Sequence, residues 1–293
     1  MITYLKYFIK KLLNKKDTSN WKLATFKSDL KKILESRKAQ KDIFRGINII
    51  ENKKDEFAAD PFLFKFKGKN FVFYEKFYKK QNKGVISVAK LKDNKLYNDR
   101  DIIVKDYHLS YPNLLKYNNN IYLMPENYQA RKLNIYKFIS FPYKLKLVES
   151  FLHNEIVADP TFFKYKNSLW FFVNKAKKDI KDLNKDLFLY KINKNFTKIT
   201  PHNQNPIKRN LYGGRSAGSI FRYQKKYIRP AQINKKETYG FGLVFFEIKK
   251  LNLDTYIEKK ITSILPSSFK NCHGVHHFSY LNNNVMIDLN LTE

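Results

Sequence analysis

A segment that recurs five times along the chain constrains its fold more than any other feature. The copies cover residues 59–75, 110–126, 158–174, 217–232 and 274–288. Each copy has a polar turn, a short strand-forming run, a tight turn with Lys, Asn or Gly, and a second run. The aromatic residues that align the copies lie 48 to 58 residues apart and are Phe66, Tyr117, Tyr165, Tyr223 and Tyr280. A repeat of this size, which accommodates about four strands, is typical of a β-propeller blade.

The repeats predict an all-β protein, a five-bladed β-propeller over residues 46–293 with a short, basic helical N-terminal extension over residues 1–45. A β-sandwich whose hairpins are similar by chance is the alternative. The shared Ala-Asp-Pro of copies one and three, each followed by aromatic residues, favours the propeller. In that fold the residues that open the repeats meet at one end of a central channel. These residues are Asp60, Tyr111, Asp159, Arg215, and His273 or His276.

The charge of the chain is strongly positive. It contains 57 Lys and Arg against 26 Asp and Glu, a formal net charge of +31, and the excess is spread along the whole sequence. One interpretation is a solvated, lysine-rich surface; the other is attraction to polyanions. Because Lys far exceeds Arg and no nucleic-acid-binding signature occurs, we expect no nucleic acid as a partner. An anionic membrane surface or a phosphorylated substrate is favoured instead.

The first sixteen residues, MITYLKYFIKKLLNKK, place apolar side chains at helical spacing with lysines between them. This pattern predicts a basic amphipathic helix on a membrane surface, or else a helix packed on the body of the protein. A second such stretch covers Ser28–Gln40. The lysines interrupt the apolar core that a signal peptide needs. No apolar run is long enough to span a bilayer. Cys272 is the single cysteine, so no disulfide can form within the chain. We therefore expect a cytoplasmic location, with the helix favouring a peripheral position on the inner face of the membrane.

Two aspartates occupy equivalent repeat positions. Asp60 and Asp159 each precede a proline, and an Asp in that position often only caps a turn. Two carboxylates at one channel mouth, however, are what chemistry at a glycosidic bond requires, one to handle a proton and one to act as base or to stabilise an oxocarbenium-like centre. Glu126 ends the second repeat and is a candidate third carboxylate, with a solvated strand-end Glu as the alternative.

Cationic and aromatic residues also fall near the repeat turns. Arg215, within the small-residue turn Gly213–Gly218, and Arg229 on the next strand could hold a phosphate or carboxylate, or could each pair with a neighbouring acid. Strand alternation sends His276 and His277 to opposite faces, so we expect no metal site. The residues expected to contact substrate by hydrogen bonding or stacking are His273, His276, Tyr111, Tyr212 and Tyr239.

The ordered motifs over about residues 50–288 resemble a known domain. They include ADPFLF, YPNLL, ADPTFF, GGRSAG, YIRPAQ and GVHHF. This series is similar to the propeller domain of bacterial surface-polysaccharide proteins and to the N-terminal part of plant glucosamine inositolphosphorylceramide transferases. It is more distantly similar to family 43 glycoside hydrolases.

The resemblance to family 43 implies a base at Asp60 and a modulating carboxylate at Asp159. The general acid expected near the fourth blade is missing, because Arg215, Ser216 and Gly218 stand there. A hydrolase without this acid cannot readily protonate its leaving group. Transfer from a nucleotide sugar needs no such acid, since cations stabilise the diphosphate leaving group. Arg215, Arg229 and His276 could supply them.

The sequence thus predicts a glycosyltransferase of cell-surface polysaccharide or glycolipid assembly, without a cofactor. Its partners would be a nucleotide sugar and a glycan or glycolipid acceptor, bound in the central pocket, with Asp60 or Asp159 as the base. Two alternatives stay open: a glycoside hydrolase in which Glu126 is the acid, and a non-catalytic glycan-binding propeller.

The charge predicts salt-sensitive binding to anionic vesicles. In a co-sedimentation assay at low salt, the chain should pellet with anionic vesicles and stay in solution with neutral ones. High salt should release it, because screening confines the attraction to roughly 10 Å at 0.1 M salt. Equal recovery in the supernatant with both kinds of vesicle at low salt would refute this prediction.

Overall fold

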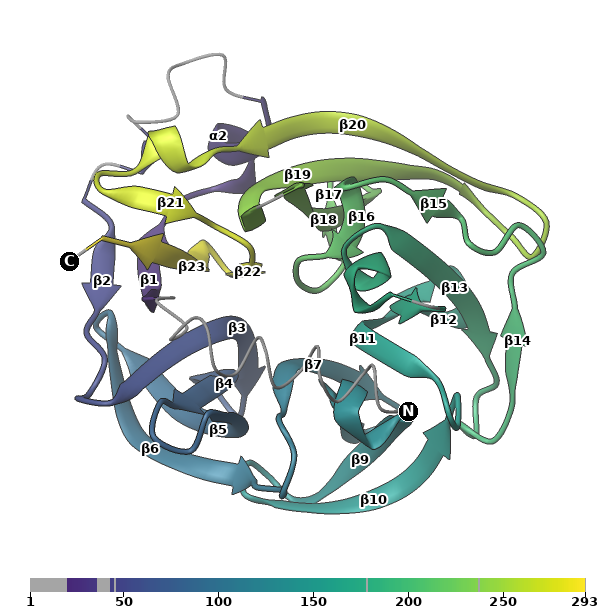
Figure 1. Cartoon of the computed structure of the whole chain (residues 1–293), viewed down its shortest axis with the longest axis horizontal. Coiled ribbons are helices and arrows are strands. Elements are labelled where there is room, and N and C mark those ends of the chain that lie inside the picture. The colour runs from purple at the N-terminus through teal and green to yellow at the C-terminus, as the bar shows by residue number, and fades with distance from the viewer. Residues whose placement is uncertain (1–19, 36–42, 45, 178, 237, 293) are drawn as a thin grey trace.

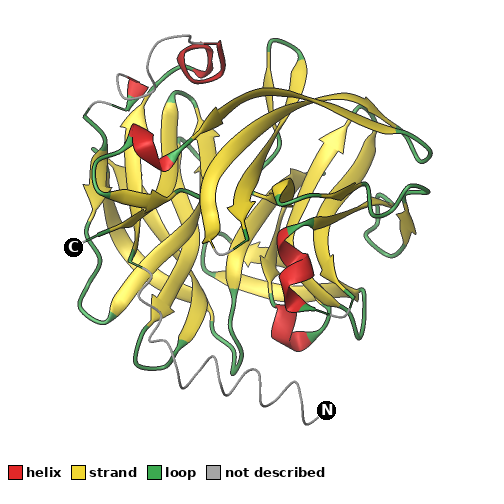
Figure 2. Ribbon diagram, turned by 45° about the horizontal axis from the view of Figure 1, so that its top comes forward, coloured by secondary structure: helices red, strands yellow, loops and turns green. Residues whose placement is uncertain are grey.

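Five antiparallel sheets are arranged in a ring, and their inner strands surround one central axis, which we call the channel axis (Figure 1). The computed structural model describes residues 20–35, 43–44, 46–177, 179–236 and 238–292. Figure 2, from a tilted view, shows how strands dominate and how little of the chain is helical. The five-bladed, all-β architecture predicted from the repeats is confirmed.

The first two blades are simple four-stranded meanders, each starting at the channel and ending at the rim. Blade one contains β3 (Glu56–Phe66), β4 (Lys69–Tyr78), β5 (Lys83–Lys92) and β6 (Lys95–Ile103). Blade two contains β7 (Ser110–Tyr117), β8 (Asn120–Glu126), β9 (Leu133–Ser140) and β10 (Lys144–Phe151), with the 3₁₀ turn η1 (Tyr128–Ala130).

The third and fourth blades each carry one extra short strand. Blade three contains β11 (Ile156–Tyr165), β12 (Ser168–Ala176), η2 (Ile180–Asn184), β13 (Asp186–Ile192), β14 (Ile199–Pro201) and β15 (Lys208–Arg209). Blade four contains β16 (Tyr212–Ser216), β17 (Phe221–Tyr223), β18 (Lys226–Lys235), β19 (Thr238–Leu251) and β20 (Tyr256–Ile264). In all five blades, the sequence repeats correspond to the two strands nearest the channel.

The fifth blade joins the two ends of the described chain. From the channel outward it consists of β21 (Cys272–Gly274) with β22 (Phe278–Leu281), then β23 (Asn284–Leu291), β1 (Trp21–Lys27) and β2 (Asn48–Ile50); η3 (Pro266–Ser268) precedes it. The seven residues of β1 pair one-to-one with Asn284–Asn290. The sequence led us to expect residues 21–27 in a helical N-terminal extension, and this expectation is wrong. They are the strand that closes the ring.

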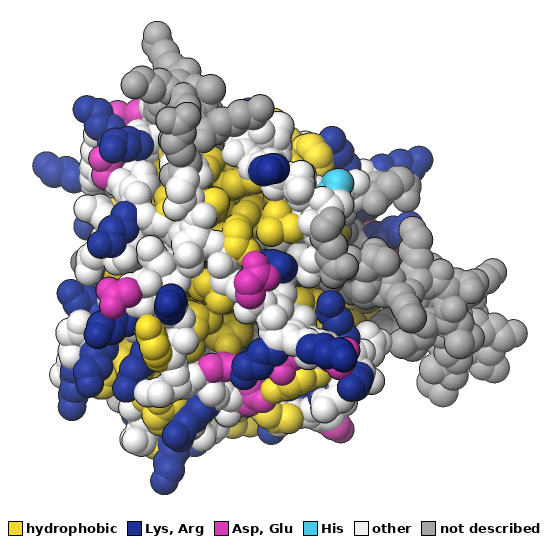
Figure 3. Space-filling view, turned by 90° about the vertical axis from the view of Figure 1, so that its left-hand side faces the viewer, with side chains coloured by type: hydrophobic (Ala, Val, Ile, Leu, Met, Phe, Trp, Pro, Cys, Tyr) yellow, Lys and Arg dark blue, Asp and Glu magenta, His cyan; other side chains and the backbone are white. Residues whose placement is uncertain are grey.

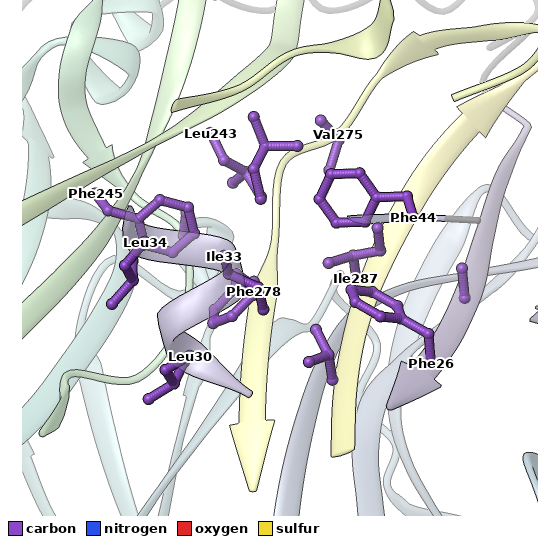
Figure 4. Packing of buried hydrophobic residues seen from close by; sticks show 14 of the residues in the cluster. Phe26, Leu30, Ile33, Leu34, Phe44, Leu243, Phe245, Val275, Phe278 and Ile287 are labelled. Carbon is purple, nitrogen blue, oxygen red and sulfur yellow. The ribbon is translucent and has the colours of Figure 1, made fainter. Parts of the chain in front are cut away.

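A short helix covers the closing blade. In α2 (Leu30–Glu35) the apolar residues Leu30, Ile33 and Leu34 share one face and are buried, and the Asp29 carboxylate accepts a hydrogen bond from the Lys32 amide at the start of the helix (2.8 Å). Figure 4 shows this face packed against aromatic and aliphatic side chains of blades four and five. The helix predicted over Ser28–Gln40 is thus present over Leu30–Glu35. The remainder of that stretch, and the predicted helix over residues 1–16, lie outside the described residues.

On the side where the ring closes, lysine and arginine side chains are scattered over the surface, as Figure 3 shows. No helix among the described residues is both long and apolar enough to cross a bilayer.

The closure of the ring predicts a large effect of truncating one side chain of β1. Leu23 is fully buried and packs with Val72, Tyr74 and Met286, across the boundary between blades five and one. Leu23→Ala should lower the free energy of unfolding by about 2–5 kcal/mol, because it leaves a cavity in a close-packed core. Denaturant titration measures this loss. Lys27→Ala, an exposed position in the same strand, is the matched control and should change stability by less than about 0.5 kcal/mol. Equal stability of both variants would contradict the closing role of β1.

Candidate functional site

All five inner strands are interrupted at the same level of the channel. In blades one to three the interruption is a bulge at Asp60, Tyr111 and Asp159, whose φ angles are 52°, 45° and 49°. In blades four and five the inner strand is divided in two, into β16 and β17 and into β21 and β22. Left-handed backbone at residues other than glycine is strained, and bulges redirect side chains near functional sites. The interruptions bring polar side chains of different blades together at this level.

Side chains of the second strands accept the backbone N–H groups that these interruptions leave without a strand partner. Glu126 Oε2 accepts from the Asp159 amide (3.2 Å), Asn174 Oδ1 accepts from the Ser216 amide (3.3 Å), and Asp288 Oδ2 accepts from the Asp60 amide (2.9 Å). Each bond runs from the inner strand of one blade to the second strand of the blade before it. The polar residues of the channel therefore also join the blades.

Arg215, Asp159 and Glu126 form a central ion cluster. The Arg215 guanidinium donates to Asp159 from Nε (2.6 Å, to Oδ2) and from Nη2 (3.2 Å, to Oδ1), and its Nη2 also donates to Glu126 Oε2 (3.2 Å). Its Nη1 donates to the side chain of Asn184 (3.0 Å), at the end of η2. Both carboxylates are buried. One guanidinium thus serves two acids.

The pKa values of the two acids are driven apart. Burial, followed by the neighbouring Asp159 charge, raises the pKa of Glu126 well above its usual range. Burial also acts to raise the pKa of Asp159, but the Arg215 guanidinium, with the hydrogen bonds from Glu126 and Arg215, outweighs it and lowers that pKa. The environment of the cluster therefore favours the neutral form of Glu126 and the ionised form of Asp159, and such a separation of pKa values is how an acid–base pair is set up.

Asp60 belongs to a second cluster, together with His276, His277 and Asp288. His276 Nδ1 lies 2.8 Å from Asp288 and its Nε2 lies 3.6 Å from Asp60, while His277 Nδ1 lies 3.2 Å from the same Asp60 oxygen. The expectation that the two histidines point to opposite faces is therefore wrong, because the interruption between β21 and β22 breaks the strand alternation. Burial lowers the pKa of His276, but the nearby Asp288 and Asp60 carboxylates raise it by more, so the cationic imidazole is favoured more than it is in water.

Ligand atoms of Asp60, His276 and Asp288 lie within 4.8 Å of one another, so they could also hold a cation. A protonated His276 would neutralise the same carboxylates. That no metal is required stays a prediction.

Tyr239 stands at the edge of both clusters and is 41% exposed. Its ring lies 4.8 Å from the Arg215 guanidinium and meets His276 edge-to-face at 5.3 Å. Two buried polar atoms nearby, Ser216 Oγ and Gln232 Oε1, have no hydrogen-bond partner among the described residues. An aromatic face beside unsatisfied polar atoms is suited to bind a polyhydroxylated ligand.

Three predicted site residues do not join this arrangement. Arg229 is buried in a separate ion cluster with Glu258 (Nε–Oε2, 2.8 Å), to which Lys208 also binds. Tyr111 is fully buried, and its hydroxyl bonds to Thr161 (2.7 Å) and accepts from the Gly218 amide (2.8 Å), so its ring offers no face to a sugar. His273 is exposed on β21, whereas both clusters are buried. Tyr212, by comparison, is half-buried.

The sequence analysis missed Asp288, although a signal for it exists. One polar residue closes each repeat at the same place, and all five are buried: Glu75, Glu126, Asn174, Gln232 and Asp288. Solvated strand ends would not be buried in every blade. The recurrence of a polar residue at this place could therefore have identified Asp288 as a member of the site.

Comparison with known proteins agrees with this architecture. Residues 47–282 match the family described as "Glucosamine inositolphosphorylceramide transferase 1, N-terminal". The chain belongs to this family. Within it, the protein named glucosamine inositolphosphorylceramide transferase 1 from Oryza sativa subsp. japonica is 31% identical over 206 residues, which are 69% of this chain and 27% of that protein. The protein of the same name from Arabidopsis thaliana is 30% identical over 232 residues, 76% of this chain and 30% of that protein.

The chain thus spans less than a third of the length of the curated relatives it matches. It shares the N-terminal family with them, and the name glucosamine inositolphosphorylceramide transferase 1 describes those longer proteins.

Solved structures of similar fold are family 43 propellers. A β-xylosidase/α-arabinofuranosidase of family 43 from a compost microbial metagenome aligns with a TM-score of 0.55 and 11% identity, over 77% of this chain and 82% of that one. An α-L-arabinofuranosidase from Lactobacillus brevis aligns with a TM-score of 0.54 and 11% identity, over 76% and 79% of the two chains. At these identities the similarity establishes the fold alone, and it bears out the distant resemblance to family 43.

The raised pKa of Glu126 predicts a pH-dependent stability that Glu126→Gln removes. A carboxyl whose pKa is raised by folding stabilises the native state below its unfolded pKa, about 4.3, and this contribution is lost as the pH rises through the folded pKa. The lowered pKa of Asp159 has the opposite effect on stability and acts at lower pH. Its stabilising contribution is present above about pH 3.9 and is lost as the pH falls further. Above about pH 4.3, the free energy of unfolding of the wild type should therefore fall relative to that of Glu126→Gln. Urea titrations over a pH series measure both. Parallel curves would contradict a protonated Glu126.

Proposed function

We propose that the chain acts on a sugar during the synthesis of a glycolipid or cell-surface glycan, and that the centre of the channel performs acid–base chemistry on it. Glu126 would donate a proton, and Asp60 would accept one from a water or an acceptor hydroxyl. The family membership supports the pathway class, and the family 43 fold is consistent with a carbohydrate ligand.

The observation that carries this proposal is the central ion cluster. Glu126 and Asp159 lie side by side under one guanidinium, so together they keep one proton, and Glu126 is the acid whose pKa is raised. The sequence analysis found no general acid in blade four and named Glu126 as the acid only in its hydrolase alternative. In our proposal, Glu126 of blade two supplies it, and Asp159 with Arg215 maintains its protonation.

Transfer from a nucleotide sugar is the second candidate, and the names of the plant relatives favour it. A diphosphate leaving group requires cations. Arg215 is already bound by two carboxylates, Arg229 by Glu258, and His276 lies between Asp60 and Asp288. A bound diphosphate would have to compete with these acids for each cation. The geometry therefore favours an oxygen leaving group that takes up a proton from Glu126.

A location at the cytoplasmic face of the membrane remains part of the proposal and is supported by the single cysteine.

The test compares release of nitrophenol from a panel of nitrophenyl glycosides with release of nucleotide from a panel of nucleotide sugars, each with and without an acceptor glycan. Glu126→Gln and Asp60→Asn should each lower turnover by about 10²–10⁴-fold, the usual contribution of a positioned acid or base. Glu75→Gln is the matched control, because Glu75 is the buried repeat equivalent of Glu126 in blade one. It should leave turnover within about twofold of the wild type.

The outcomes separate the three functions. Loss of activity on glycosides in both variants supports acid–base chemistry. Release of nucleotide alone, unaffected by Glu126→Gln, would indicate transfer from a nucleotide donor instead. Glycan binding without turnover of any substrate would identify a binding module, and full activity in both variants would remove Asp60 and Glu126 from the mechanism. Melting temperatures of all variants must be compared first, because the same side chains join the blades.

A further inference from the structure

A cavity of about 420 Å³ opens where the inner strands of blades two, three and four reach their hairpins. Lys116, Lys164, Lys166 and Arg222 line it, together with apolar and aromatic side chains that include Phe163 and Tyr227. No acidic residue is among the described residues that form its wall.

The cations of this cavity arise from the repeat itself. Lys116, Lys164 and Arg222 each precede the aromatic residue that aligns their repeat, as Lys65 does in blade one. The same position on three consecutive inner strands therefore presents a positive charge to the channel. This regularity distinguishes the cavity from the lysines that are scattered over the rest of the surface.

These four cations have no acidic partner. Within the described part of the chain, no carboxylate oxygen lies within 4.0 Å of Lys116, Lys164, Lys166 or Arg222. By contrast, Arg215 and Arg229 each bind a carboxylate. All four residues are exposed, so water screens much of the repulsion among them, and a bound anion would relieve what remains.

The cavity is distinct from the carboxylate centre. Lys164 follows Asp159 by five residues along β11, and at about 3.3 Å per residue this places the two roughly 16 Å apart. Asn113 donates from Nδ2 to Ser219 Oγ (3.3 Å) and accepts from the Phe162 amide (2.9 Å), between the two levels. The channel thus has an acidic level and a basic level, separated by hydrogen-bonded side chains.

We propose that this cavity binds a phosphate or diphosphate ester. The phosphate oxygens would contact the cations, and the organic group of the ester would contact the apolar wall. Lys and Arg side chains recognise phosphate oxygens by charge-assisted hydrogen bonds. The walls of Leu114, Phe163 and Ile220 contact the organic group, and the volume lies within the usual range of small-molecule sites, about 300–1,000 Å³. A phospholipid headgroup and a soluble phosphate ester share this chemistry.

The experiment uses two probes on the whole chain. Binding of inorganic pyrophosphate is measured by calorimetry, and binding to phosphatidylcholine vesicles with and without phosphatidic acid is measured by co-sedimentation. Lys164→Ala/Arg222→Ala should weaken binding of the recognised probe by about tenfold or more. The control is Lys144→Ala/Lys146→Ala, which removes the same charge from exposed positions of β10.

Three results support the site and identify its ligand source. Pyrophosphate binding that only the cavity variant loses indicates a soluble phosphate ester. Vesicle binding that only the cavity variant loses indicates a lipid headgroup. Vesicle binding that pyrophosphate displaces indicates that both occupy one site. Equal effects of the two double variants, or no binding of either probe by the wild type, would overturn the proposal. Turnover at the acidic level is a separate measurement, so this result does not depend on the proposed function.

Discussion

The hydrogen bonds that pass from the side chains of one blade to the backbone of the next are the interaction on which the rest of the structure depends. Every inner strand is interrupted at the level of Asp60 and Asp159, and each interruption removes backbone amides from the sheet. A buried amide without a partner costs about 1–3 kcal/mol. Glu126, Asn174 and Asp288 remove this cost by accepting amides of the following blade. The same bonds hold the carboxylates of the site in place.

Polar side chains of the centre thus both join neighbouring blades and form the site, and this explains the electrostatics of the centre. Asp159 and Asp288 are both buried where neighbouring blades meet, and burial alone would favour their neutral forms. Arg215 and His276 counter that tendency, and the lowered pKa values of both aspartates follow. Glu126 shares Arg215 with Asp159, and burial together with the Asp159 charge raises its pKa. Chemistry and ring assembly thus rely on one set of charges.

The internal repeat predicted the five blades, and it placed Asp60 and Asp159 at equivalent positions of two inner strands, because stacked repeats present the same positions to one axis. It could not predict the closing strand, since Trp21–Lys27 has no counterpart in the repeats and its partner lies some 260 residues away. Nor could it predict that Arg229 pairs with Glu258, because β20 lies outside the repeated segment. Strand alternation failed at His276 and His277 for a similar local reason, a break that the regular pattern conceals.

The interrupted inner strands have a further consequence for how the chain avoids self-association. The innermost strand of each blade is a sheet edge, and an unbroken edge is a template on which another extended chain can add itself. Here the kink at Asp60, Tyr111 and Asp159 breaks the row of free amides and carbonyls, and neighbouring side chains occupy several of the amides that remain. In β3 and β11 the regular stretch after the kink is five residues long, over Phe62–Phe66 and Thr161–Tyr165. The geometry that assembles the polar centre therefore also protects the protein from aggregation through its channel.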